Sequence, residues 1–211
     1  MVGFFGVIII VMNLLEIFFP RKCLECNKVN KYMCISCLDK VPVGGWYNNN
    51  YSIFRYKGVI RKAIISLKYK FAYDLSDELS LVIINKLKDI NFPFKNIILV
   101  PIPLHVQREN WRGFNQLAIV GEKIAKKMKW KYYPNLLIKY KKTDPQVNLK
   151  GIDRRKNLSG VFVINPTHKL PLTNNLILFD DVYTTGSTIN EAKKVLKDAG
   201  FSKIYSLTIA R

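Results

Sequence analysis

Apolar runs alternate with amphipathic segments along most of this chain, which is the pattern of an α/β protein. Residues 96–102 and 176–179 are almost continuously apolar, so they are predicted to be strands covered on both faces. Residues 51–56 and 204–210 show a period of two, in which every second side chain shares one face, and are predicted as further strands. The sequence therefore predicts a parallel sheet with helices on its faces.

Helical periodicity marks the segments that separate these strands. An apolar face that includes Val59 and Leu67 predicts one helix, with Lys68 exposed on its other side. Residues 75–88 predict a second amphipathic helix, and a third ends near Met128. Strands separated by helices are the arrangement in which ligands bind beyond the carboxyl ends of the strands.

The helix that follows residues 176–179 has signals at both ends. Ile189 and Leu196 lie on its apolar face, and Thr188 and Glu191 have the spacing of a capping box. Gly200 is predicted to end the helix as its C′ residue. A strand, a turn, a helix and a final strand are thus predicted in that order.

The turn in this unit has the sequence D-D-V-Y-T-T-G-S-T, residues 180–188. Free backbone N–H groups, hydroxyls and a helix N-terminus suit an anion, and two carboxylates lie beside them. A sugar phosphate fits such a site, with its phosphate in the turn and its hydroxyls or a metal on the acids. The alternative is a solvated strand end followed by an ordinary turn. The candidate catalytic residues are Asp180 and Asp181, and the candidate phosphate-binding residues are Thr184, Thr185, Gly186, Ser187 and Thr188.

All four cysteines fall within fifteen residues, as two C-x-x-C pairs. Two such pairs can bring four thiolates to one Zn²⁺ in a tetrahedral arrangement, so structural zinc is the predicted cofactor. Disulfides and redox catalysis are the alternatives, and the paired spacing favours neither. The predicted zinc ligands are Cys23, Cys26, Cys34 and Cys37.

The first nineteen residues are nearly all apolar, and Glu16 is the charged residue among them. Such a segment is just long enough to cross a membrane. A signal peptide is not favoured, because no basic residue precedes the apolar run and no cleavage motif follows it. A helix docked on the domain is the preferred interpretation, which predicts a cytoplasmic protein; a membrane anchor through residues 1–19 is the alternative.

The chain of 211 residues suits one main domain with a small appendage, and its apolar content excludes wholesale disorder. It carries 34 Lys and Arg against 15 Asp and Glu, a net charge of +19. Such a charge favours phosphorylated ligands, nucleic acid or anionic membranes as partners. Because the excess is mostly scattered Lys, charge alone does not choose between them.

Two further segments supply candidate ligands. Arg108 and Arg112 follow the strand at 96–102 and are candidates for bidentate contacts to phosphate oxygens, with surface ion pairs as the alternative. Residues 141–157 lack periodicity and are interpreted as a long loop, either a lid or a surface excursion; Gln146 and Arg154 are its candidate ligands. Residues 41–50 are interpreted as a linker.

Taken together, these segments resemble the ComF family over about residues 14–211. The resemblance rests on F-P-R-K-C-L-E-C, L-K-Y, V-P-I-P-L-H with R-G-F-N-Q, P-Q-V-N-L with R-R-K-N-L-S-G-V-F, and F-D-D-V-Y-T-T-G-S-T, in this order. It implies a zinc ribbon joined to a phosphoribosyltransferase-like domain, with a role in competence and DNA uptake. The expected organisation is an apolar helix at 1–19, a zinc-ribbon module at 20–45 and a phosphoribosyltransferase-like domain at 51–211.

The resemblance also implies roles for the candidate residues. Residues 180–188 are similar to the motif that binds phosphoribosyl pyrophosphate (PRPP) in type I phosphoribosyltransferases, where Tyr183 replaces a more usual aliphatic residue. Asp180 and Asp181 are then expected to face the ribose hydroxyls and to help hold Mg²⁺. Residues 184–188 are expected to wrap the 5′-phosphate, the chain after Pro103 to form the pyrophosphate loop, and residues 146–157 to form the lid.

Two other functions stay open at this stage. The same fold could be catalytically silent and sense PRPP or a nucleotide, while its basic surface and zinc module contact single-stranded DNA or a partner in transformation. A membrane-tethered competence component is the third interpretation, and it depends on residues 1–19 alone. The acceptor base and the occurrence of ribosyl transfer do not follow from the sequence.

Overall fold

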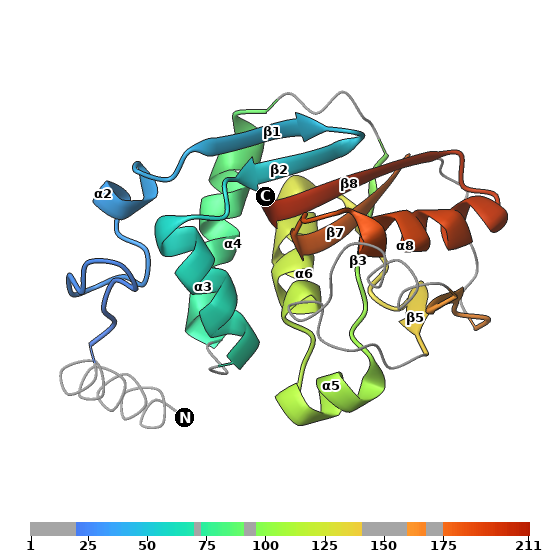
Figure 1. The fold of residues 1–211 in the computed structure, drawn as a ribbon, viewed down its shortest axis with the longest axis horizontal. Coiled ribbons are helices and arrows are strands. Elements are labelled where there is room, and N and C mark those ends of the chain that lie inside the picture. The colour runs from blue at the N-terminus through green and yellow to red at the C-terminus, as the bar shows by residue number, and fades with distance from the viewer. Residues whose placement is uncertain (1–19, 70–72, 91–95, 141–159, 168–174) are drawn as a thin grey trace, which may run out of the picture.

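A six-stranded sheet organises the protein, which we describe from a computed structural model over residues 20–69, 73–90, 96–140, 160–167 and 175–211. Its strand order is β1-β2-β8-β7-β3-β4 (Figure 1), and every pair except β1 with β2 is parallel. The bounds are β1 Val43–Tyr47, β2 Asn50–Phe54, β3 Ile98–Pro101, β4 Lys131–Tyr132, β7 Asn175–Val182 and β8 Lys203–Ala210. The predicted fold class, a mostly parallel α/β sheet with a small cysteine module, is confirmed.

Strands β3 and β7 lie side by side in the interior of the sheet, and their apolar side chains are covered on both faces. Residues 98–100 and 176–179 are essentially inaccessible to water, as the apolar runs predicted. Beyond their paired residues, the Ile102 N–H donates to the Phe179 carbonyl at 2.8 Å. The carboxyl ends of β3 and β7 therefore stay side by side where the two chains leave the sheet.

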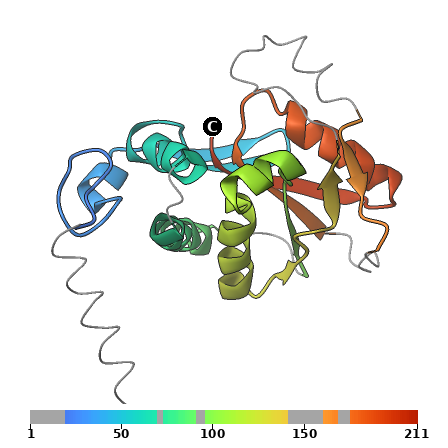
Figure 2. The ribbon, with the colours of Figure 1, turned by 90° about the horizontal axis from the view of Figure 1, so that it is seen from below.

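Helices on opposite faces of the sheet follow these two strands. Helix α6, Gln116–Met128, packs against β3 and β4, whereas α8, Ser187–Asp198, packs against β8 on the opposite face (Figure 2). The connections that follow β3 and β7 thus run to opposite faces. This is the topological switch point at which parallel sheets bind ligands.

The other helices are α2 Ile35–Leu38, α3 Gly58–Tyr69, α4 Tyr73–Lys88 and α5 Val106–Arg112. Helix α4 packs on α6, and α3 packs on α4, so the three form a layer beside the sheet. A second, two-stranded antiparallel sheet pairs β5, Leu137–Lys139, with β6, Phe162–Ile164. Strand β6 packs on α8, which places the small sheet next to the switch point.

The expected linker at 41–50 is wrong for most of its length. Strand β1 begins at Val43 and pairs with β2 as a hairpin. Asn48 and Asn49 form its two-residue loop, both with positive φ (46° and 58°). Asparagine tolerates this left-handed conformation, so the polar run encodes a tight hairpin turn instead of a flexible connection.

The predicted capping box at Thr188 and Glu191 is also wrong. The N-cap of α8 is Gly186, in a left-handed conformation, and the helix begins at Ser187. The Glu191 carboxylate instead accepts a hydrogen bond from the Gly160 N–H at 2.5 Å. Gly200, in contrast, has a φ of 95° just past α8, as predicted for a C′ glycine.

The cysteine module docks on the helices α3 and α4. The Glu78 carboxylate of α4 accepts hydrogen bonds from the backbone N–H groups of Tyr32 (2.9 Å) and Met33 (2.6 Å). The Met33 side chain is almost completely buried. These contacts fix the second C-x-x-C segment against the main domain.

No helix in the described ranges is both long and apolar enough to cross a bilayer. Residues 1–19, on which the membrane alternative depends, lie outside the described residues.

Replacement of Glu78 by alanine tests the docking of the module. The Glu78→Ala variant should lose about 2–3 kcal/mol of unfolding free energy, because two backbone N–H groups lose an ionised acceptor. Urea unfolding followed by circular dichroism measures the loss. Glu122→Ala, at an exposed glutamate of α6, is the matched control and should change stability by less than about 0.5 kcal/mol. Equal effects in both variants would contradict the docking role of Glu78.

Candidate functional site

The two predicted carboxylates lie at the carboxyl end of β7, directly at the switch point. Asp180 is in register with Thr208 of β8, and its Oδ1 accepts the N–H of Asp181 at 2.8 Å. The Asp181 Oδ2 lies 2.6 Å from the Nζ of Lys68, in the last turn of α3. Lys68 is thus part of the site, and its predicted exposure is wrong: its side chain is 26% exposed.

A second lysine faces the acids from the small sheet. Lys139 ends β5, where it forms an isolated parallel bridge with His105. Its ammonium group interacts electrostatically with Asp180 and with Arg108 of α5. Lys68 of α3 and Lys139 of β5 therefore both supply positive charge to the acid pair, and Arg108 of α5 acts on Lys139.

Burial makes the charges of this cluster interdependent. Burial, followed by the charge of Asp181, raises the pKa of Asp180 to about 7, although the Asp181 N–H and the two lysines oppose the rise. Burial and then Arg108 lower the pKa of Lys139 to about 8, against the pull of Asp180. Burial alone would lower the pKa of Lys68, but Asp181 beside it gives a net rise. A carboxylate and an amine that titrate near neutrality are typical of functional sites.

The turn after the acids has a shape that depends on one glycine. Gly186 has a φ of 76°, and a Cβ at this position would overlap the hydroxyl end of the Tyr183 ring. The Thr185 and Ser187 hydroxyls lie 2.7 Å apart at the start of α8. The turn thus gathers hydroxyls at the N-terminus of a three-turn helix, an arrangement that suits a phosphate group.

Tyr183 links this turn to the hairpin. Its ring is nearly buried and meets the Tyr47 ring edge-on, with 5.8 Å between centroids. The guanidinium of Arg211 stacks on the other ring, 3.6 Å from the centroid of Tyr47. The aromatic side chain that departs from the family pattern therefore serves as a support for the turn.

The segment after β3 combines capping with charge. His105 caps α5 by accepting the Gln107 N–H on Nδ1 at 3.2 Å. Asn115 caps α6 through Oδ1, and its Nδ2 donates to the Ile102 carbonyl at 3.3 Å. Much of the V-P-I-P-L-H and R-G-F-N-Q sequence thus shapes the backbone beside the acid pair, while Arg108 contributes charge.

The other predicted phosphate ligands cannot be placed. The backbone of Arg112 lies in α5, but its side chain is not described. Gln146 and Arg154 lie outside the described residues, together with the whole expected lid at 146–157. Their roles stay predictions.

The residues missed by sequence reasoning are the two lysines. Lys68 lies within the L-K-Y motif, which contributes to the family resemblance but does not indicate a function for the lysine. Lys139 lies in a strand of three residues that was not predicted, so the sequence offered no signal for it.

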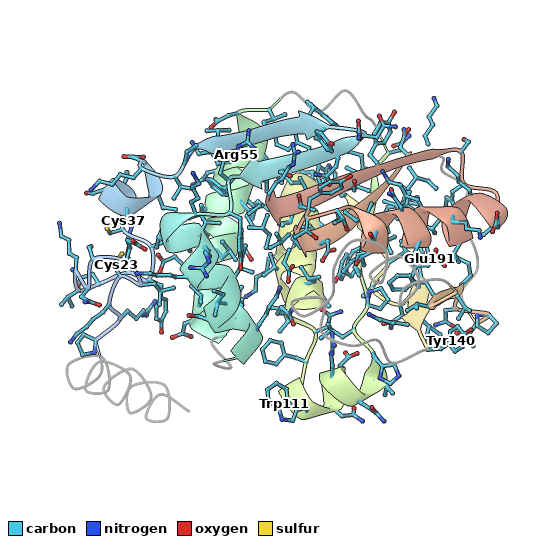
Figure 3. All side chains as sticks on the ribbon, viewed as in Figure 1. Cys23, Cys37, Arg55, Trp111, Tyr140 and Glu191 are labelled. Atoms are coloured by element: carbon cyan, nitrogen blue, oxygen red, sulfur yellow. The ribbon has the colours of Figure 1, made fainter. Side chains whose placement is uncertain are left out.

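The four cysteines form a separate cluster on the far side of α3 (Figure 1), where Figure 3 shows Cys23 and Cys37 next to each other. All four sulfur atoms lie within 4.8 Å of one another. The Cys26 and Cys34 sulfurs are 3.6 Å apart, close to the spacing of about 3.8 Å that tetrahedral Zn–S bonds of 2.3 Å require. The cysteines are positioned to bind a metal ion, as predicted.

The backbone of the cluster supports thiolate ligands. Burial raises the pKa of Cys23, but N–H groups of Cys26, Cys34 and Glu25 that point at its sulfur give a net lowering, whereas the neighbouring thiols raise the pKa of Cys37. An antiparallel bridge between Lys22 and Val29 closes a tight loop that holds the first two cysteines. Asn27 adopts a positive φ of 62° in this loop. Such a loop is typical of a metal-binding knuckle.

Known proteins resemble this chain at the level of sequence. It is 32% identical to competence protein F of Haemophilus influenzae over 54% of this chain and 49% of that protein. Its identity to competence protein ComFC of Bacillus subtilis is 28%, over 77% of this chain and 64% of that protein. DNA utilization protein YhgH of Salmonella typhi is 24% identical, over 84% and 77%. The first two alignments thus span about half to two thirds of those relatives.

These relatives confirm the resemblance to the ComF family that the motifs indicated. No protein-family model matches the chain. Among solved structures, adenine phosphoribosyltransferase from Leishmania tarentolae is similar, with a TM-score of 0.38 and 13% identity over 74% of this chain and 62% of that one. So distant a likeness supports no argument about the site, which rests on the geometry described above.

The raised pKa of Asp180 predicts a pH-dependent cost in stability. Because the folded-state pKa of about 7 exceeds the ordinary value of 3.8, stability should fall as the pH rises from about 4 to 7. Asp180→Asn removes this cost and keeps an oxygen to accept the Asp181 N–H. Its Tm should exceed that of the wild type by at least about 2 °C at pH 8, and by much less at pH 5.

Thermal unfolding at both pH values measures this difference. Asp89→Asn, at an exposed aspartate beyond α4, is the control and should shift Tm about equally at pH 5 and pH 8. If Asp180→Asn behaves as the control does, the carboxyl group of Asp180 is not held in the protonated form by the fold.

Proposed function

We propose that this chain, a relative of the ComF-type competence proteins, binds PRPP or a nucleotide at the carboxyl ends of β3 and β7 and serves DNA uptake or utilisation. The observation that supports the proposal is the acid pair Asp180–Asp181 directly followed by the hydroxyl-lined turn at the start of α8. Carboxylates accept hydrogen bonds from vicinal ribose hydroxyls, whereas N–H groups of a helix N-terminus bind phosphate. A ribose 5-phosphate group presents both at a fixed separation.

In this proposal the turn binds the 5′-phosphate. The residues involved are Thr184, Thr185, Gly186, Ser187 and Thr188. The positive end of α8 and the Thr185 and Ser187 hydroxyls would supply the hydrogen bonds. Gly186 permits the shape of this turn, since its φ is left-handed and a side chain there would meet Tyr183.

The cations around the acids suit a diphosphate. Arg108 and Lys139 interact electrostatically with each other, and Lys139 also with Asp180, so each can contact phosphate oxygens of a ligand bound beside the acids. Mg²⁺, where it accompanies PRPP, would supply charge neutralisation of the pyrophosphate, with the acid pair nearby. Arg112, Gln146 and Arg154 remain candidate ligands of the same groups.

We propose ribosyl transfer as the reaction class that such a site favours. The C1–O bond of PRPP breaks with its electron pair on the leaving pyrophosphate, a C1–N bond to an acceptor forms, and the acceptor loses a proton. Positive charge that develops on the ribose is stabilised by the neighbouring carboxylates, and Arg108 and Lys139 stabilise the leaving group. No protein nucleophile is needed. A silent site that senses PRPP or a nucleotide is the alternative.

We further propose that the four cysteines bind one structural Zn²⁺. Four thiolates fill a tetrahedral zinc site and leave no open position for a substrate. The metal would stabilise the short module of residues 20–45, whose segments otherwise share a small apolar core.

PRPP binding predicts a thermal shift that depends on the shape of the turn. With Mg²⁺ and PRPP at a hundredfold excess over Kd, Tm should rise by about 5 °C or more. Gly186→Ala should abolish the shift, because it moves the turn. Gly200→Ala is the matched control: it has a similar positive φ at the other end of α8 but open space around it, so it should keep the shift.

The double variant Asp180→Asn/Asp181→Asn should also lose the shift. A wild-type protein that PRPP does not stabilise would exclude the proposal, and so would a shift that survives both the Gly186 and the acid-pair changes. Pyrophosphate release during a screen of bases with PRPP and Mg²⁺ separates transfer from silent binding.

Zinc binding predicts a metal content near one zinc per chain after purification under reducing conditions. Cys34→Ser should lower both this ratio and Tm, since it removes one of four ligands. Ser36→Ala, an exposed position between Cys34 and Cys37, is the control and should alter neither. Protein that is folded and free of zinc would contradict the site.

A further inference from the structure

The ion pair of Lys68 and Asp181 joins the end of α3 to the end of β7. The two charged atoms are 2.6 Å apart, and the side chains are 26% and 15% exposed. Residue 68 is more than a hundred positions from Asp181 in sequence, so the pair depends on the tertiary fold. A pair this close and this shielded is screened much less by salt than a surface pair.

The Lys68 ammonium group lies beside the acid pair, where a bound divalent cation would otherwise lie. A divalent ion on two adjacent carboxylates needs direct oxygen contacts at about 2.0–2.2 Å for Mg²⁺. In this site the Lys68 ammonium already binds the Asp181 Oδ2, and the Asp180 Oδ1 accepts a backbone N–H. Both carboxylates therefore have partners without a metal.

Displacement of Lys68 is costly. A metal that took Asp181 would leave a largely buried ammonium group without its carboxylate, and breaking a buried pair in this way is strongly unfavourable. The metal would also meet the positive charge of Lys139 on the side of Asp180. The phosphates of a ligand, in contrast, offer both the lysines and the metal new anionic partners.

We propose that Lys68 is the resident counter-cation of the acid pair: it positions Asp181 and keeps divalent metal off the ligand-free site, so that metal enters only with the phosphates of a ligand. The statement about entry with a ligand rests on the proposed function. The exclusion of metal from the ligand-free site does not, and it is tested without PRPP.

The experiment uses Mn²⁺ alone with the full-length, zinc-loaded protein. Electron paramagnetic resonance of free Mn²⁺ gives the affinity. Lys68→Met should bind Mn²⁺ at least about tenfold more tightly than the wild type, because a neighbouring positive charge has been removed from two carboxylates. Lys68→Arg keeps the charge and should behave as the wild type does, whereas a purely structural role of the side-chain stem would predict that Lys68→Met also behaves as the wild type.

Lys62→Met is the matched control. Lys62 lies on the same helix and forms an exposed ion pair with Glu25 at 3.1 Å. This variant loses the same charge and should leave Mn²⁺ affinity unchanged. A Mn²⁺ affinity that rises equally in both variants, or in neither, overturns the proposal.

A second comparison needs no change at Lys68, in case that variant does not fold. Wild-type protein and Asp180→Asn/Asp181→Asn should bind Mn²⁺ equally weakly, because Lys68 and the Asp181 N–H already contact the two carboxylates of the wild type. Clearly tighter binding by the wild type shows that the acid pair accepts metal without a ligand and overturns the proposal. If the Mn²⁺ results are as expected but PRPP produces no thermal shift, the proposed function fails and the role of Lys68 stands.

Discussion

The central constraint on this protein is that β7 is enclosed within the sheet on both edges and on both faces. It is paired on both edges, by β3 and β8, and its apolar side chains are covered on both faces. A strand of this kind can present polar groups only where it leaves the sheet. The acids, the turn and the start of α8 therefore follow one another at its carboxyl end, next to the end of β3. Because the connections after these two strands run to opposite faces, the two strand ends form the switch point of the sheet.

Carboxylates at the end of a buried strand need nearby positive charge, and in this protein it comes from parts of the chain that are distant in sequence. Lys68 reaches the site from α3, and Lys139 reaches it from β5. Each lysine lowers the pKa of Asp180, yet burial and Asp181 outweigh them and keep that pKa near 7. The positive and negative charges of the site are thus nearly equal in number, and the carboxyl group of Asp180 is the one that titrates near neutral pH. Under the proposed function, the phosphates of a ligand would pair with the lysines, while the acids would face its hydroxyls.

What the sequence predicted well has local physical causes. The apolar runs at 96–102 and 176–179 became β3 and β7 because only a strand buried on both faces tolerates four successive apolar residues. The cysteine pairs met because their spacing and short loops leave few other arrangements. These features depend on near neighbours in the chain.

What the sequence did not predict depends on tertiary contacts or on left-handed backbone. The run at 41–50 looked like a linker, since asparagines with positive φ resemble loop residues until β2 provides a partner. Thr188 and Glu191 had the spacing of a capping box, but the left-handed Gly186 moved the helix start and freed Glu191 for Gly160. Lys68 could be placed only once α3 and β7 were positioned together, because no spacing along the chain relates it to Asp181.

The same helix that supplies Lys68 also supports the cysteine module, which gives the module a structural route to the site. Helix α2 of the module contacts α3, and Lys62 of α3 pairs with Glu25. That ion pair is exposed and contributes little, as surface pairs generally do. The stronger attachment is to α4, where Glu78 binds two backbone N–H groups beside the buried Met33. Helix α3 packs on both the module and α4, and the module also contacts α4 directly. Because Lys68 lies in the last turn of α3, its contact with Asp181 depends on how α3 is packed as well as on the acid pair itself.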